Sequence, residues 1–177
     1  MALLWIDTSV VRSVTDLRRL ALLAREKQVT VVLHPQVYLE RRRQVQVQFA
    51  EQGRTFEHAV FNDLWESLGI QVFEMRLSRS TAAAWADILF ARYPTHTAWE
   101  SAKKDTLDGR LRKGFAVEPG QMLMTTDWLV ALEVEHDPDS FVITKDTGEE
   151  WKALRAAQPP RAFSFQEALE WLERLPA

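Results

Sequence analysis

The sequence predicts an α/β fold in which a central parallel sheet of about five strands is covered by helices on both faces. Short apolar runs, several of them rich in β-branched residues, alternate along the chain with longer segments whose apolar residues follow the helical period. Glycine and proline are scattered, and no repeat, linker or low-complexity tract marks a boundary. We therefore expect one domain over residues 1–177, with an extended helical segment near residues 95–124.

Five segments are predicted to be strands. The first is wholly apolar and ends at Asp7, and the second is rich in valine and ends at His34-Pro35. The strands are expected at residues 2–6, 29–33, 70–73, 141–144 and 161–163. The carboxyl ends of parallel strands meet at one edge of a sheet, where ligands of such folds bind.

Helices are predicted between these strands, at residues 17–27, 35–49, 56–68, 81–93, 127–135 and 165–175. One stretch is ambiguous, because residues 44–49 alternate polar and apolar as a strand does. Pro35 suits the first turn of a helix, so we expect a helix there. Ser164 and Glu167 have the spacing of a capping box, which predicts the start of the last helix.

Composition excludes several classes of protein. An apolar fraction of 46% and a charged fraction of 27% are typical of a soluble globular domain. The net charge of −3 excludes a polybasic nucleic-acid binder, and the lack of cysteine excludes disulfides, thiolate metal sites and cysteine nucleophiles. The sequence contains no apolar run of membrane-spanning length and no secretory signal, so we expect a cytoplasmic protein.

Four acidic residues are placed where their side chains are expected to converge. Asp7 directly follows the first strand, and Asp146 comes shortly after the fourth. Glu40 lies one turn into the helix after the second strand, and Asp127 opens the helix before the fourth strand. Clustered carboxylates repel one another unless a cation neutralises them. Oxygen ligands without histidine or cysteine favour Mg²⁺ or Mn²⁺, which activate water and stabilise charge in phosphodiester cleavage.

Each acid also has an ordinary structural interpretation. Asp7 and Asp127 suit the N-terminus of a helix, Glu40 suits a solvated helix face, and Asp146 suits a turn. It is less probable that all four acids have unrelated structural roles at one edge of the sheet than that they form one functional site. The joint pattern therefore favours a metal-dependent nuclease with Asp7, Glu40, Asp127 and Asp146 as catalytic residues and metal ligands.

Supporting residues follow from their positions near these acids. Thr144 and Ser9 are expected to orient a carboxylate or a water molecule, although a strand threonine and a helix-start serine are equally ordinary. Glu149 and Glu150 are expected to lie in a solvated first turn rather than to add a ligand. Weak candidates for phosphate contacts are Arg12, Arg41, Arg43, Lys103 and Lys104.

Four segments together resemble the PIN-domain family, which includes VapC-type ribonuclease toxins. They are residues 4–10 (LWIDTSV), 33–40 (LHPQVYLE), 126–131 (TDWLVA) and 142–146 (VITKD), and the resemblance spans about residues 3–151. It implies a three-layer α/β/α fold and Mg²⁺- or Mn²⁺-dependent cleavage of RNA or of structured DNA. The long segment from Thr95 to Met124 and the bulky Trp128 depart from the compact toxin pattern.

The leading hypothesis is an endoribonuclease, in the setting of a type II toxin–antitoxin pair. The resemblance then implies an RNA substrate, a small antitoxin that masks the site, and a homodimer. The alternatives are a catalytically idle scaffold that binds RNA or protein, and a structure-specific DNA nuclease. A haloacid-dehalogenase-like phosphatase is disfavoured, because Ser9 occupies the position where its second acid is required.

Overall fold

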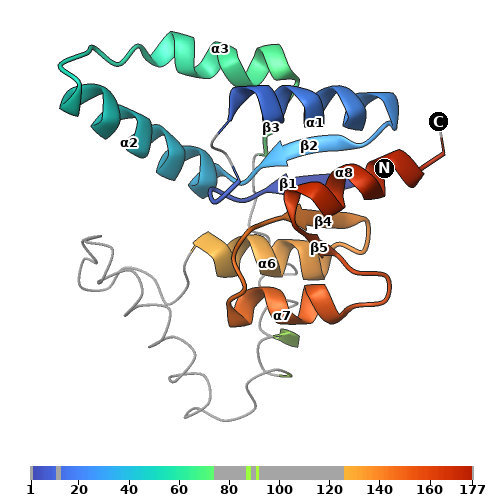
Figure 1. Cartoon of the computed structure of the whole chain (residues 1–177). Coiled ribbons are helices and arrows are strands. Elements are labelled where there is room, and N and C mark those ends of the chain that lie inside the picture. The colour runs from blue at the N-terminus through green and yellow to red at the C-terminus, as the bar shows by residue number, and fades with distance from the viewer. Residues whose placement is uncertain (1, 11–12, 74–86, 89–90, 92–125, 177) are drawn as a thin grey trace.

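Five parallel strands form one sheet in the computed structural model, which describes residues 2–10, 13–73, 87–88, 91 and 126–176 (Figure 1). The strands are β1 Leu3–Ile6, β2 Thr30–Leu33, β3 Gln71–Val72, β4 Ser140–Ile143 and β5 Ala162–Phe163. Their order across the sheet is β3-β2-β1-β4-β5. The predicted fold class is confirmed, and every predicted strand is present with an end shifted or trimmed by one or two residues.

Helices cover both faces of the sheet and make three layers (Figure 1). On one face lie α1 Val14–Glu26, α3 His58–Leu68 and α8 Phe165–Arg174, where α1 packs on both of the others. On the other face lie α6 Thr126–His136 and α7 Glu149–Ala156, which pack on each other. The helix α2, Pro35–Glu51, extends from the edge of the sheet where the strands end.

The central strand β1 is apolar because helices cover it from both sides. Leu4, Trp5 and Ile6 are each at most 1% exposed. Successive side chains of a strand point to opposite faces, so a strand buried on both faces reads as a continuous apolar run. Full burial of a side chain of this size contributes roughly 1.5–3 kcal/mol to stability. This buried strand delivers Asp7 to the carboxyl edge of the sheet.

The ambiguous stretch at residues 44–49 is helical, as predicted. His34 caps α2, since its Nδ1 accepts a hydrogen bond from the Gln36 backbone N–H at 3.1 Å, and Pro35 occupies the first turn. Val45 packs against the core whereas Val47 is 49% exposed. The alternation therefore does not define one buried face, which a strand would require.

Two helices begin at a serine that caps them. Ser13 caps α1, with its hydroxyl accepting from the Asp16 backbone N–H at 3.2 Å, so α1 begins at Val14 rather than at Leu17. Neither Asp7 nor Ser9 is therefore the cap of this helix. At the other end of the chain, the predicted capping box of α8 is present between Ser164 and Glu167.

Two predicted segments fall wholly or mainly outside the described residues: the helix expected at residues 81–93 and the extended segment near 95–124. Among the helices that the structure describes, none combines the length and the apolar character that crossing a membrane requires.

Candidate metal centre

The candidate site lies at the carboxyl ends of β1 and β4, at the point where the order of the strands along the chain changes direction across the sheet. The chain runs outward from β1 through β2 to β3, and then returns to the other side of β1 with β4 and β5. Beyond the strands, the Asp7 backbone N–H donates to the Ile143 carbonyl at 3.0 Å, which joins the ends of β1 and β4. In parallel α/β sheets, the crevice at such a switch point is the usual place for a ligand.

Three of the four predicted acids come together there. Asp7, Asp127 and Asp146 each contribute a carboxylate oxygen, and these three oxygens lie within 4.8 Å of one another. Asp7 is buried, Asp127 is half-buried and Asp146 is exposed. The cluster thus extends from the interior of the fold to its surface, where a cation from solvent has access to it.

Hydroxyl groups hold the buried carboxylate in place. The Oδ2 atom of Asp7 accepts from the Ser9 hydroxyl at 2.6 Å and from the Thr144 hydroxyl at 2.9 Å. The Ser9 oxygen accepts from the Lys145 backbone N–H at 3.0 Å. The Thr144 oxygen accepts from the Asp146 backbone N–H, also at 3.0 Å. A hydroxyl group has a single proton to donate. Because each hydroxyl oxygen accepts from a backbone N–H, its own proton is directed at the Asp7 carboxylate.

This arrangement fits a hard divalent cation. The Asp7 side chain is fully buried, and its partners among the described residues are the hydroxyls of Thr8, Ser9 and Thr144 rather than a cationic side chain. A buried charge is costly unless it is paired or coordinates a metal. Three carboxylates with no sulfur or imidazole suit Mg²⁺, Mn²⁺ or Ca²⁺.

Arg155 of α7 fixes the loop that carries Asp146. Its Nη2 atom donates to the Thr144 carbonyl at 3.2 Å and to the Asp146 carbonyl at 3.0 Å. The sequence prediction missed this residue. Arg155 lies near the end of the helix that follows Asp146. Nothing in the neighbouring sequence indicates its contact with this loop, because the contact depends on how α7 packs.

Glu150 corrects one expectation. Glu149 is exposed, as predicted for a solvated first turn of α7, but Glu150 is only 8% exposed. Burial raises the pKa of the Glu150 carboxyl, and the negative charges of Asp146 and Asp7 raise it further, against a lowering by its own backbone N–H. The carboxyl folds over Gly148, where a Cβ would collide with it. In the sequence, the feature that agrees with this burial of Glu150 is the glycine two positions before it, Gly148.

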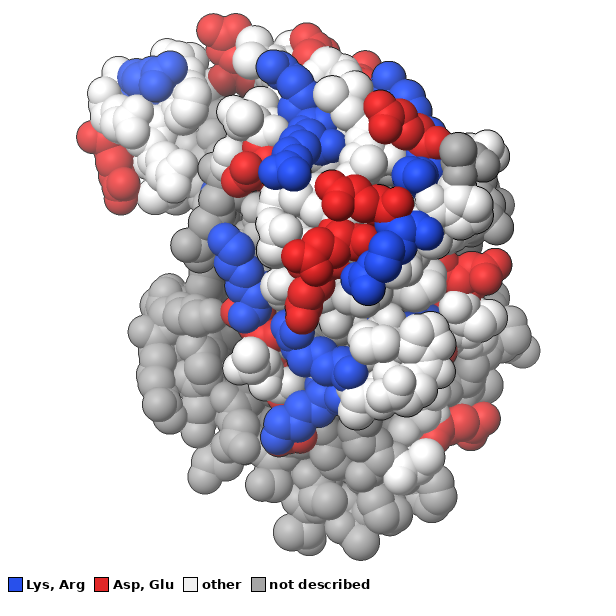
Figure 2. Space-filling model, turned by 45° about the vertical axis from the view of Figure 1, so that its right-hand side comes forward, with Lys and Arg blue, Asp and Glu red and all other residues white. Residues whose placement is uncertain are grey.

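The remaining predicted residues are not all placed. Glu40 and Arg43 lie on α2, but their side chains are outside the described part of the structure, as are Arg12, Lys103 and Lys104. Arg41 is described, and it lines a pocket between α1, α2 and α3. On the face shown in Figure 2, the described basic and acidic side chains are intermixed and form no continuous basic patch.

Comparison of the chain with family models, with curated proteins and with solved structures gives no match. The resemblance to PIN domains therefore stays a prediction from four short motifs. The geometry above stands independently of it.

Proposed function

We propose that this protein is a metal-dependent phosphodiesterase, and specifically an endoribonuclease of the PIN type. The observation that carries the proposal is the convergence of the Asp7, Asp127 and Asp146 carboxylates at the switch point of a parallel sheet. In the sequence, Asp7 and Asp146 follow predicted strands, and Asp127 begins a predicted helix.

The three aspartates would hold Mg²⁺ or Mn²⁺, and Glu40 would be the fourth acidic ligand. Such an ion supplies activation of water and stabilisation of charge during displacement at a phosphodiester. The protein's own part is to hold the Asp7 carboxylate in a fixed orientation. Ser9 and Thr144 do this, because each hydroxyl proton is directed at the same carboxylate oxygen.

The biological setting follows only from the motif resemblance. We propose an RNA substrate, a small antitoxin that covers the site, a homodimer and a cytoplasmic location. The rival proposals of an idle scaffold and of a DNA nuclease use the same fold. Measurements of activity and of substrate preference separate them.

The test is cleavage of a panel of single-stranded RNA, structured RNA and DNA, in Mn²⁺ or in EDTA. Asp7→Asn and Asp146→Asn are expected to lower Mn²⁺-dependent cleavage of RNA on the order of a hundredfold or more. Asp146 is exposed, so its variant tests the site without disturbing the core. Asp16→Asn, which changes an exposed acid of α1, is the matched control.

Cleavage of RNA that needs the metal and is lost in both site variants would support the ribonuclease. Preferential cleavage of DNA would support the rival nuclease. Cleavage that persists in both variants, or that EDTA leaves unchanged, would contradict the proposal.

A further inference from the structure

One guanidinium group holds the backbone just beyond the carboxyl end of β4. The Nη2 atom of Arg155 donates to the Thr144 carbonyl at 3.2 Å and to the Asp146 carbonyl at 3.0 Å. This nitrogen has two protons, so one is available for each carbonyl. Hydrogen bonds from an ionised donor are stronger than those between neutral groups. The backbone on both sides of Lys145 is thereby tied to α7.

The helix that carries Arg155 is packed firmly against its neighbours. Trp151 and Leu154 are buried, and α7 contacts both α6 and β5. The Leu154 carbonyl also accepts from the Arg161 backbone N–H at 2.9 Å, which joins the end of α7 to the start of β5. A side chain on a packed helix positions its target more precisely than one on a loop. Arg155 is therefore a fixed support for the loop.

The two carbonyls belong to residues that organise the aspartate cluster. The Thr144 hydroxyl donates to the Asp7 carboxylate and accepts from the Asp146 backbone N–H. Asp146 itself supplies one of the carboxylate oxygens of the cluster. A displacement of this loop would move the Asp146 carboxylate together with the hydroxyl that orients Asp7. One side chain thus acts on two of the three candidate ligands.

The arginine has two costs at this place. Its Nε atom is buried and has no hydrogen-bond partner among the described residues, and an unpaired buried donor is destabilising. Its positive charge also lies beside the Asp146 backbone, where it repels a cation bound to the cluster. Its hydrogen bonds to the loop are the contribution that offsets these costs.

We propose that Arg155 is a positioning residue of the metal centre, which raises the affinity for the divalent cation by holding the loop from Thr144 to Asp146. The proposal rests on the metal centre at Asp7, Asp127 and Asp146. A positioning effect differs in sign from an effect of charge. Removal of a positive charge near a cation site strengthens cation binding by electrostatics alone, whereas loss of the support for a ligand weakens it.

The experiment is calorimetric titration of Mn²⁺ into the full chain, Arg155→Met and Arg155→Lys. Methionine is unbranched and has no donor, and it is expected to weaken Mn²⁺ binding roughly tenfold. Lysine keeps a charged donor and is expected to recover part of the affinity. Arg155→Gln, a second neutral variant, replaces Arg155→Met under the same criterion if circular dichroism shows that Arg155→Met does not fold. Mn²⁺ binding by the neutral variant that equals or exceeds that of the wild type would overturn the proposal.

Arg161 provides the matched control, because it holds the opposite end of β4 in the same way. Its guanidinium donates to the carbonyls of Val134, Asp137 and Ser140, the first residue of β4. Arg161→Met is expected to lower the free energy of unfolding in urea while Mn²⁺ binding stays close to that of the wild type.

The outcomes separate this proposal from the metal centre itself. An equal loss of Mn²⁺ affinity in Arg155→Met and Arg161→Met would show that the loss reflects destabilisation alone, which contradicts a positioning role. Wild-type binding without a loss in Arg155→Met contradicts the role of Arg155 and leaves the metal centre standing. Absence of Mn²⁺ binding by the wild type contradicts both.

Discussion

Thr144 connects two of the three acids through one hydroxyl group. It donates to the Asp7 carboxylate at 2.9 Å and accepts from the Asp146 backbone N–H at 3.0 Å. The residue is fully buried at the end of β4, so its rotamer is fixed by packing as well as by these bonds. Its hydroxyl, rather than its methyl group, is therefore the part that organises the site.

Thr144→Val is accordingly expected to weaken Mn²⁺ binding roughly ten- to hundredfold, because the shape is kept while the orienting hydrogen bonds are lost. Thr144→Ser keeps the hydroxyl and is expected to retain most of the affinity. Calorimetric titration with Mn²⁺ measures both. A Thr144→Val protein that folds and binds Mn²⁺ as tightly as the wild type would show that this hydroxyl has no role in the site.

His34 gives the protein a pH-dependent stability that is separate from the acids. The residue is 3% exposed, and burial lowers its pKa from 6.5 to about 4. Its Nδ1 accepts from the Gln36 N–H, which leaves the proton on Nε2, and that nitrogen has no hydrogen-bond partner among the described residues. The folded state therefore keeps this imidazole neutral where the unfolded chain binds a proton.

Because the unfolded state binds more protons between pH 4 and 6.5, the free energy of unfolding is expected to rise with pH across that window. The gain is about 3 kcal/mol, fully present above pH 6.5 and lost as the pH falls through about 4. His34→Asn keeps a cap acceptor and removes the titration, so its stability should depend less on pH. Urea unfolding at several pH values tests this, with the exposed His58→Asn as control. A slope equal to that of the wild type would contradict the assignment.

At the scale of single elements, the capping box of α8 is the clearest case in which local sequence determines where a helix begins. The Ser164 hydroxyl accepts from the Glu167 N–H at 3.3 Å, and the Glu167 carboxylate accepts from the Ser164 N–H at 2.7 Å. Hydrogen bonds that Ser164 donates to the Glu167 carboxylate, first of all from its backbone N–H, lower the pKa of Glu167. The helix they begin buries Ala168, Leu169 and Leu172 against the sheet layer.

Ser164→Ala is expected to reduce the free energy of unfolding by about 1 kcal/mol, because the Glu167 backbone N–H loses the hydroxyl oxygen that accepts its hydrogen bond. Ser164→Thr retains a cap hydroxyl and should cost less. Denaturant unfolding at neutral pH distinguishes them. Equal stability of Ser164→Ala and the wild type would mean that packing alone sets the start of α8.

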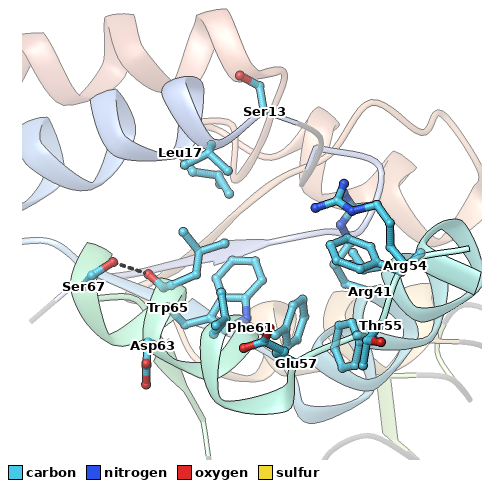
Figure 3. A pocket seen from close by; sticks show the side chains of 16 residues that line it. Ser13, Leu17, Arg41, Arg54, Thr55, Glu57, Phe61, Asp63, Trp65 and Ser67 are labelled. Atoms are coloured by element: carbon cyan, nitrogen blue, oxygen red, sulfur yellow. Dashed lines mark hydrogen bonds between the residues drawn. The ribbon is translucent and has the colours of Figure 1, made fainter. Parts of the chain in front are cut away.

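Elements were predictable from the sequence where their determinants are local. Apolar runs gave the strands, Gly69 ended α3 in a left-handed conformation, and the Ser164 box began α8. The sequence analysis expected Glu150 to be exposed and did not predict the contact of Arg155 with the Asp146 loop. Both the burial of Glu150 and this contact depend on where α7 packs, which local sequence does not show. The pocket between α1, α2 and α3 (Figure 3) could not be predicted either, because it depends on the relative placement of three helices.

At the scale of the whole molecule, parallel topology explains why the aspartates could be predicted to meet. Residues that follow parallel strands collect at one edge, whatever the strand order. The order β3-β2-β1-β4-β5 adds what the sequence did not show, namely that β1 and β4 are neighbours. Asp7 and the loop with Asp146 are therefore adjacent, and Asp127 reaches them from the first turn of α6.

The central claim is that these three aspartates form one divalent-cation site. The most direct measurement is calorimetric titration of Mn²⁺ into the wild type, Asp146→Asn, Asp127→Asn and the control Asp16→Asn. We expect saturable binding by the wild type and the control, weakened roughly tenfold or more in both site variants. Absence of binding by the wild type, or equal binding by all four proteins, would contradict a metal centre at this edge of the sheet.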